Sequence, residues 1–301
     1  MPYTTLFRSV TSKNRHLYAR QLQEMHQLRR LHFIEENGWT DLKVVDGGEV
    51  DQFDDDLAVY LLALGPDDEI EVGLRVRSTL DGCILTDAFP HMIAQGGPSL
   101  KGAEAWEMSR IFSTHAYRKN RRGGRRVAEA FLAAMEVAHA HGASRLVGMV
   151  DMRLYPLASN IAWDLKLTGL PAPYAFGVMA GVYAPIGASE IARLRESLGG
   201  LSAAGYEIED EDIALCGDFQ AIESQFRRAR AAVRPMMEMD EGPHAIAPAA
   251  ALYAYFPRPR LAPPQPGPPG PWSSRRLAPP ALSAPPPSSS RPLAAAPAPS
   301  P

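Results

Sequence analysis

The chain has 301 residues, of which 46% are hydrophobic and 22% charged, which is typical of a soluble globular protein with one large domain or two smaller ones. The net charge of −3 argues against a protein that simply coats nucleic acid. Two cysteines and 8 histidines show no metal-ligand spacing, so we predict neither a metal site nor a disulfide framework. No apolar run approaches the roughly 18 residues that span a bilayer, and we expect a cytoplasmic protein.

Both ends of the chain differ from the rest. Residues 2–9 read as the translation of a widely used sequencing adapter, so we expect residues 1–9 to be non-native and to take no part in the fold. The alternative is a native N-terminal strand. Residues 257–301 hold 17 prolines in 45 positions and no Asp or Glu, which predicts a disordered tail or a non-native extension, with a proline-rich ligand for a partner as the alternative. A single domain is expected over residues 10–235, followed by a linker over residues 236–256.

The first elements alternate a helix, a loop and two strands. Residues 13–38 have helical spacing and end at the helix stop Asn37-Gly38. Residues 49–56 are acidic without helical periodicity, and we expect an ordered loop or a flexible lid anchored by Phe53. Residues 58–64 and 69–76, on either side of a Gly-Pro-Asp-Asp turn, predict an antiparallel hairpin. Residues 82–93 form another apolar segment.

The second half predicts strands and helices in alternation. We expect strands at residues 105–114, 145–150 and 174–183, and helices from about 127 to 141 and at 157–167, 188–198 and 211–233. This order predicts an α/β or α+β fold with a mixed sheet.

A basic, glycine-containing run precedes the first of these helices. Its charged residues are Arg118, Lys119, Arg121, Arg122, Arg125 and Arg126. A glycine loop at a helix N-terminus can bind phosphate, so this run is a candidate contact for pantetheine phosphate, a coenzyme A pyrophosphate or an acidic carrier protein. The alternative is a solvated basic turn.

The strand at residues 105–114 places Glu107 and Arg110 among Trp, Met, Ile and Phe. Buried charges are tolerated when they are paired and hydrogen-bonded. The chain offers four possible partners upstream: Arg29, Asp51, Asp54 and Arg75. Together with Glu107 and Arg110 they make three acids and three arginines, whose charges balance as a charged pocket requires. The alternative is a set of unrelated surface ion pairs, each worth roughly 0–1 kcal/mol.

Several of these residues fall into an ordered series of motifs. The series comprises Arg29, Phe33 and Trp39, then Asp51 and Asp54, then Gly73-Leu-Arg75, Phe89-Pro90 and Glu107-Met-Ser-Arg110. In order and spacing it resembles the acyl-homoserine lactone synthases, the LuxI-type autoinducer synthases of bacterial quorum sensing, over about residues 15–200. The resemblance implies a mixed twisted sheet flanked by helices, similar to Gcn5-type N-acetyltransferases, with a V-shaped cleft.

The resemblance also implies a two-substrate acyltransferase without a cofactor. The amine of S-adenosylmethionine would attack an acyl thioester carried by acyl carrier protein or coenzyme A. The substrate carboxylate would then close the lactone and release methylthioadenosine. Glu107 would accept the amine proton, Phe33 and Trp39 would line the S-adenosylmethionine pocket, and the charged network around both would comprise Arg29, Asp51, Asp54, Arg75 and Arg110.

The acyl group is expected to contact an apolar set, although core packing is the alternative for each member: Phe89, Met149, Val150 and Phe176. Two departures from the family pattern stand out. Ser78 occupies the position before Thr79 where many members have proline, and residues 147–151 lack the threonine that members making 3-oxo products often carry. The second departure predicts an acyl group without a 3-oxo function.

Two other functions remain open at this point. A related N-acyltransferase acting on another amine, without lactone formation, would share the fold and the basic loop. A nucleic-acid or acidic-protein binder would use Arg118–Arg126, and its binding would weaken steeply with salt.

Overall fold

The computed structural model describes residues 7–65, 68–115, 123–161, 164–198, 205–206, 218–220 and 223. The proline-rich tail, the predicted linker, most of the predicted helix at 211–233 and the basic residues 118–122 lie outside these ranges, so their predictions stand as made. Within the described ranges, no helix is both long and apolar enough to cross a membrane.

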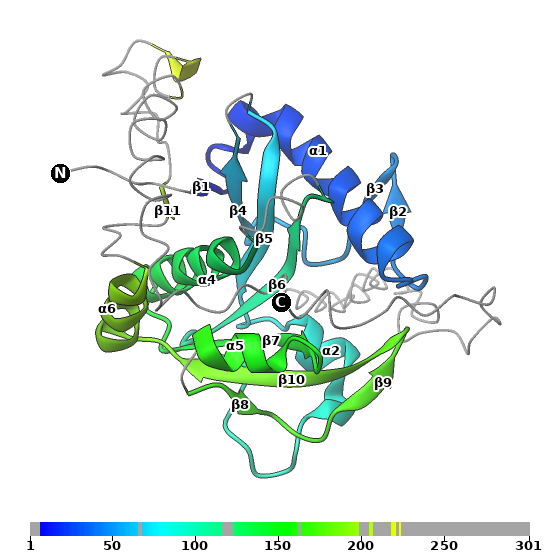
Figure 1. Ribbon diagram of the computed structural model, residues 1–301, viewed down its shortest axis with the longest axis vertical. Helices are drawn as coiled ribbons and strands as arrows, with labels where there is room; N and C mark the ends of the chain where they lie inside the picture. The colour runs from blue at the N-terminus through cyan, green and yellow to red at the C-terminus, as the bar shows by residue number, and fades with distance from the viewer. Residues whose placement is uncertain are drawn as a thin grey trace, which may run out of the picture.

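One mixed sheet organises the fold (Figure 1). Its path is β11-β1-β4-β5-β6-β7-β10-β8, with β9 paired to β10. The pairs β1–β11 and β6–β7 are parallel and the others antiparallel. The strands are β1 (Phe7–Val10), β4 (Val59–Leu64), β5 (Ile70–Ser78), β6 (Ala105–Ser113), β7 (Arg145–Asp151), β8 (Lys166–Leu167), β9 (Ala172–Tyr174), β10 (Gly177–Pro185) and β11 (Gly205–Tyr206), beside a separate hairpin of β2 (Val44–Val45) and β3 (Gly48–Glu49).

Helices cover both faces of the sheet, as the mixed α/β prediction requires (Figure 1). One face carries α4 (Gly123–Ala140), α5 (Tyr155–Ile161) and α6 (Ala188–Ser197). The other carries η1 (Arg15–Tyr18), α1 (Ala19–Arg29), η2 (Arg30–Glu36), α2 (Ile84–Ala88) and η3 (Pro90–Met92). Strand β4 shows the consequence, because its alternate residues Leu61 and Leu62 join the cores on opposite faces and both are fully buried.

The first helix changes its pitch before it ends. Its buried positions Gln21, Met25, Arg29 and Phe33 recur every four residues, a spacing that drifts around a regular α-helix of 3.6 residues per turn. The π-helical turn η2 is wider, and it keeps Phe33 on the buried face. Leu31, two residues before Phe33, is turned outward and is 41% exposed.

Strands β6 and β7 pair over only about half of their length and then separate. Their parallel pairing runs from Ala105–Arg145 to Met108–Gly148, whereas β6 continues to Ser113 and β7 to Asp151. A Cβ on Gly148 would lie 2.8 Å from the carbonyl oxygen of Met108, so only glycine lets the strands come this close where they begin to separate. The opening between them corresponds to the predicted V-shaped cleft.

Two secondary-structure predictions are wrong in part. The helix expected at 157–167 ends at Ile161, and Lys166–Leu167 pairs with β10 as β8. The strand expected at 174–183 is a hairpin instead, in which β9 turns back through Ala175, at φ 46°, into β10. The loop expected at 49–56 is ordered, and its Phe53 is buried as predicted.

The N-terminal prediction also needs correction. Residues 7–10 form β1, which pairs antiparallel with β4, and Phe7, Arg8 and Ser9 are all buried. Arg8 donates two hydrogen bonds, of 2.8 and 3.1 Å, to the buried Glu223 carboxylate. Whatever the origin of the adapter-like sequence, the part from Phe7 onward belongs to the fold, so residues 7–9, which the prediction left out, are part of the domain.

We predict that Phe7→Ala lowers the free energy of unfolding by about 3–5 kcal/mol, because the change leaves a cavity in the core on the α4 face of the sheet. Deletion of residues 1–9 should lower the melting temperature for the same reason. Urea denaturation measures the effect, with Leu170→Ala, at a position 85% exposed, as the control. Equal stability of the two variants would mean that β1 contributes nothing.

Candidate active site

Six buried charges form a closed ring of alternating sign. Arg29 contacts Glu49 and Asp54, Arg75 contacts Asp54 and Asp51, and Arg110 contacts Asp51 and Glu49. Every guanidinium thus bridges two carboxylates and every carboxylate bridges two guanidiniums. We call this set the charge ring.

The ion pairs of the charge ring have short donor–acceptor distances, and several of them are bidentate. Arg29 donates to both oxygens of Asp54 at 2.6 and 2.9 Å and to Glu49 Oε2 at 2.6 Å. Arg75 donates to both oxygens of Asp51 at 2.6 and 3.0 Å and to Asp54 Oδ1 at 2.9 Å. Arg110 reaches Glu49 at 3.0 Å and Asp51 at 2.8 Å. Such bidentate pairs fix geometry as well as charge.

The sequence prediction identified five of the six ring members and missed Glu49, which is fully buried. In its place the prediction counted Glu107 as the third acid. The missed signal lay in the same acidic stretch, because Glu49 and Asp51 are two residues apart in an extended segment and so face the same side. Gly48 brings Glu49 against α1, since a Cβ there would lie 2.6 Å from Cβ of His26.

A β-bulge turns Arg110 into the charge ring. Gly73 pairs with Phe112 while Arg75 pairs with Ser109, so β6 has one residue more than β5 at this point. Arg110 takes φ 54°, a conformation that is costly for a side chain with a Cβ and that marks a local constraint. Without the bulge, strand alternation would point Arg110 to the α4 face of the sheet.

The arginines favour the ionised forms of Asp51 and Asp54. Burial by itself raises the pKa of Asp54, but Arg29 and Arg75 outweigh it and hold this pKa well below its usual range. Burial likewise opposes ionisation of Asp51, where Arg75 and Arg110 lower the pKa. Tyr60 donates a hydrogen bond of 3.0 Å to Asp54, and burial together with that acid raises the pKa of the Tyr60 phenol.

Glu107 is not a member of the charge ring. It lies on β6, like Arg110, but before the bulge. Its carboxylate accepts hydrogen bonds from the backbone N–H groups of Ile84, at 3.1 Å, and Leu85, at 3.0 Å, at the start of α2. Burial raises the pKa of Glu107, while these N–H groups and Arg75 act in the opposite direction. Glu107 is therefore a buried carboxylate held by backbone donors, with a greater proton affinity than an exposed one.

An aromatic pocket opens beside Glu107 at the point where β6 and β7 separate. Phe33 stacks on Trp39 at 5.0 Å, Trp39 meets the edge of Tyr174 at 5.2 Å, and Tyr174 meets Phe89 at 5.1 Å. The full lining is Phe33, Trp39, Leu42, Ile84, Phe89, Glu107, Met108, Ser109, Arg110, Ile111, Met149, Tyr174 and Met179.

The structure separates the predicted pocket residues into two groups. Phe33, Trp39, Phe89 and Met149 line the pocket. Val150 follows Met149 on β7, so its side chain points to the other face, and it is not part of the lining. Phe176 is 51% exposed in the β9–β10 turn, where its ring lies over Gly38. Tyr174, which the sequence analysis did not select, lines the pocket and donates to Asp41 at 2.9 Å.

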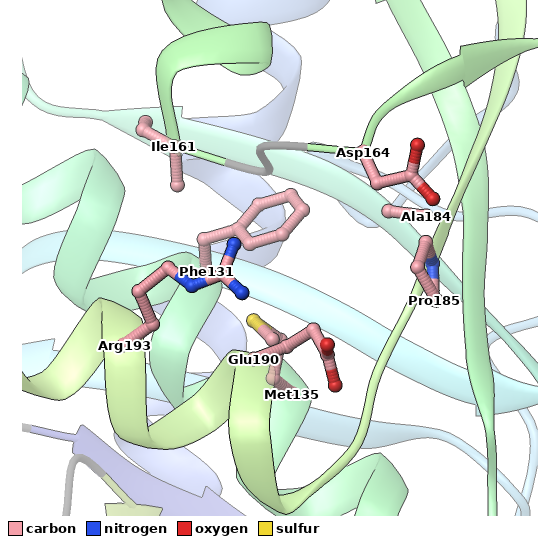
Figure 2. A pocket seen from close by; sticks show the side chains of 8 residues that line it. All are labelled: Phe131, Met135, Ile161, Asp164, Ala184, Pro185, Glu190 and Arg193. Carbon is pink, nitrogen blue, oxygen red and sulfur yellow. The ribbon is translucent and has the colours of Figure 1, made fainter.

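A second hollow lies on the α4 side of the sheet, among α4, α6 and the end of β10 (Figure 2). Phe131, Met135 and Ile161 give it an apolar floor. Its two acids have partners of their own, since Asp164 pairs with Lys166 at 3.1 Å and Glu190 accepts from the Ser189 hydroxyl at 2.8 Å. This hollow belongs to the packing of α6, whereas the pocket at Glu107 collects the charges and aromatic rings.

Comparison with known proteins places the chain in a family. Residues 13–184 match the family model described as Autoinducer synthase, so the chain belongs to that family. It is 31% identical over 168 residues to the isovaleryl-homoserine lactone synthase of Bradyrhizobium diazoefficiens, covering 56% of this chain and 74% of that protein. It is 28% identical over 181 residues to a probable acyl-homoserine-lactone synthase of Sinorhizobium fredii, covering 59% and 86%.

Solved structures agree with the family. The coenzyme A-dependent acyl-homoserine lactone synthase BjaI, determined with S-adenosylmethionine and isopentyl-coenzyme A, superimposes with a TM-score of 0.61 at 25% identity, over 75% of this chain and 99% of that one. The synthase TofI, determined with an inhibitor and methylthioadenosine, gives a TM-score of 0.51 at 26% identity, over 58% and 90%. The chain is an acyltransferase of the acyl-homoserine-lactone synthase type.

The ring predicts how stability depends on acid. Asp51 and Asp54 have lowered pKa values in the folded state, so their contribution is present above the unfolded value of about 3.9 and is lost as the pH falls below it toward the folded values. Asp54→Asn should therefore flatten the acid limb of the stability curve. Urea denaturation at a series of pH values below about 5 measures this. The exposed Asp56, changed to Asn, is the control; an unchanged slope in Asp54→Asn would exclude the ring as the source.

Proposed function

We propose that this acyl-homoserine-lactone synthase carries out both of its steps in the pocket between β6 and β7, with Glu107 as the base. The observation that supports the proposal most directly is the position of the Glu107 carboxylate. It is buried, fixed by two backbone donors, and part of a wall that also contains aromatic rings and Arg110.

Acyl transfer needs a neutral amine. An α-amine has a pKa near 7.7–8 and is mostly protonated at neutral pH, so a base must remove its proton before it attacks the thioester carbonyl. Burial raises the pKa of Glu107 and brings its proton affinity closer to that of the amine. A matched base of this kind transfers a proton more effectively than a strongly acidic carboxylate such as Asp54.

S-adenosylmethionine would occupy the side of the pocket formed by Phe33 and Trp39. Its sulfonium is a cation, and aromatic faces attract cations. The Phe33 ring already has a cationic neighbour, since Cζ of Arg110 lies 5.6 Å from its centre. The substrate carboxylate would pair with a guanidinium of the charge ring. Arg110 is the arginine of that set that also lines the pocket.

Lactone formation is then a matter of orientation. The carboxylate displaces the sulfonium-bound group within the same molecule, so holding it in line with the scissile carbon supplies much of the rate. Sulfonium is a good leaving group and needs little help from an acid. Backbone N–H groups of β6 and β7 beyond Met108 and Gly148, where the two strands no longer pair with each other, are candidate donors to the oxyanion of the first step.

The acyl chain would extend along the other side of the pocket, against Phe89, Met149, Met179 and Ile84. Coenzyme A is the donor that the relatives favour, because BjaI is described as coenzyme A-dependent. Acyl carrier protein remains an alternative donor. The basic residues Arg118–Arg126 suit either donor by charge, as predicted above, although residues 118–122 and the side chains of residues 123–126 lie outside the described part of the chain.

The sequence alone left open a related N-acyltransferase that does not lactonise. It would consume the thioester without releasing methylthioadenosine. Release of methylthioadenosine in step with free thiol therefore separates the two reactions.

We predict that the purified enzyme, given S-adenosylmethionine and an acyl-coenzyme A, forms a lactone whose acyl group lacks a 3-oxo function. Residues 147–151 offer no threonine hydroxyl, and a buried 3-oxo carbonyl without a donor costs about 1–3 kcal/mol. Mass spectrometry with branched, straight and 3-oxo donors in competition gives the preference. A dominant 3-oxo product would contradict the prediction.

We also predict that Glu107→Gln keeps the fold and loses about 10²–10⁴ in the rate of acyl transfer, because the amide is nearly isosteric but accepts no proton. Methylthioadenosine release and thiol release are measured together, and circular dichroism monitors the fold. Glu129→Gln, on α4 behind the sheet, is the matched control. A folded Glu107→Gln variant with near-normal turnover would remove Glu107 from the mechanism.

A further inference from the structure

We infer that Arg77 is a positioning residue that clamps together two loops on which the active site depends, an inference that rests on the proposed function. Arg77 follows Arg75 by two residues on β5 and faces the same side of the sheet. It pairs across the sheet with Glu107, whereas Arg75 pairs with Ser109. Arg77 is 4% exposed and belongs to no part of the charge ring.

One edge of the Arg77 guanidinium holds the acid-pair loop, residues 50–58. Its Nε and Nη2 donate to the two oxygens of Asp55 at 3.0 and 2.6 Å. Asp55 follows Asp54 directly in the chain, so this bidentate pair fixes the loop next to the acid that bridges Arg29 and Arg75.

The other edge holds the helix-entry loop, residues 79–83. Nη1 and Nη2 donate to the two oxygens of Asp81 at 2.8 and 2.9 Å, and Nη1 also donates to the carbonyl of Gly82 at 3.2 Å. The next residues begin α2, whose Ile84 and Leu85 N–H groups hold the Glu107 carboxylate. Through this loop Arg77 acts on the donors that aim Glu107.

Phe53 completes the clamp from the acid-pair loop. Its ring is 5% exposed and lies 5.4 Å from Cζ of Arg77 and 5.8 Å from Cζ of Arg75. It also packs in one core with the start of α2, including Ile84 and Leu85. Arg77, Phe53 and the two loops are therefore one unit, with the charge ring on one side and the support of Glu107 on the other.

The Arg77 contacts differ from a purely structural ion pair in the exposure of the partners. The side chain of Asp55 is 38% exposed and that of Asp81 is 56% exposed. Such pairs add little to stability. Their geometric effect is larger, because a planar guanidinium bound on two edges sets the spacing between the loops.

The test compares Arg77→Met with Arg8→Met. Arg8 is also a buried arginine with a bidentate acid partner, Glu223, but it lies on β1 at the far side of β4 and outside the pocket. Arg77→Met should lower kcat/KM by about 10- to 100-fold, because a misplacement of about 1 Å can cost about 10²-fold. Arg8→Met should lower the melting temperature without changing the kinetic constants.

Two further variants separate the edges of the clamp. Asp55→Asn loosens the acid-pair loop and should raise the Kd of S-adenosylmethionine, measured by calorimetry, with little change in kcat. Asp81→Asn loosens the entry to α2 and should lower kcat with little change in that Kd. Arg77→Lys, which keeps the charge but not the two-edged geometry, should recover only part of the loss.

The outcomes are distinct. Normal Kd and kcat in a folded Arg77→Met variant would overturn the inference, as would Asp55→Asn and Asp81→Asn variants that both behave as wild type. Failure of the wild-type protein to bind S-adenosylmethionine or to form a lactone would instead overturn the proposed function. Wild-type turnover together with the Kd and kcat split supports the clamp.

Discussion

The charge ring is the interaction on which the rest of the structure depends. Three guanidiniums and three carboxylates are taken out of water together, which is tolerable only because each charge meets two opposite charges at hydrogen-bonding distance. Loss of any one member leaves buried charge uncompensated. The ring members come from five segments, which must therefore pack together at one place: α1, β3, the acid-pair loop, β5 and β6. The aromatic pocket lies beside this place.

Strand β6 carries two functional side chains in different surroundings, Glu107 and Arg110. Before the bulge it presents Glu107, which backbone donors hold and burial makes less acidic. At the bulge it presents Arg110, which is held by Glu49 and Asp51. Glu107 and Arg110 are three residues apart, and the extra residue of the bulge lets both side chains face the same side of the sheet. The separation from β7 begins at the same height, so the pocket opens where both groups point.

Much of this could be predicted from the sequence. Alternation and turn residues predicted β4, β5, β6 and β7 and the helices α1, α4 and α6, and motif spacing identified five of the six ring members. What failed depends on contacts between distant segments. The bulge that turns Arg110, the partners of Glu107 and the burial of β1 are set by tertiary pairing. Val150 was misplaced because a run of apolar residues without alternation gives no sign of which side chains face the pocket.

The split of the sheet gives the two halves of the pocket separate origins. The charge ring and the Phe33–Trp39 stack come from β6 and the segments that precede it in the chain, whereas Met149, Tyr174 and Met179 come from β7, β9 and β10, on the other side of the split. Changes on the later strands can accumulate without disturbing the balance of buried charge. With the acyl group placed against these strands as proposed, substitutions there would change the acyl group of the product while the six buried charges keep their partners.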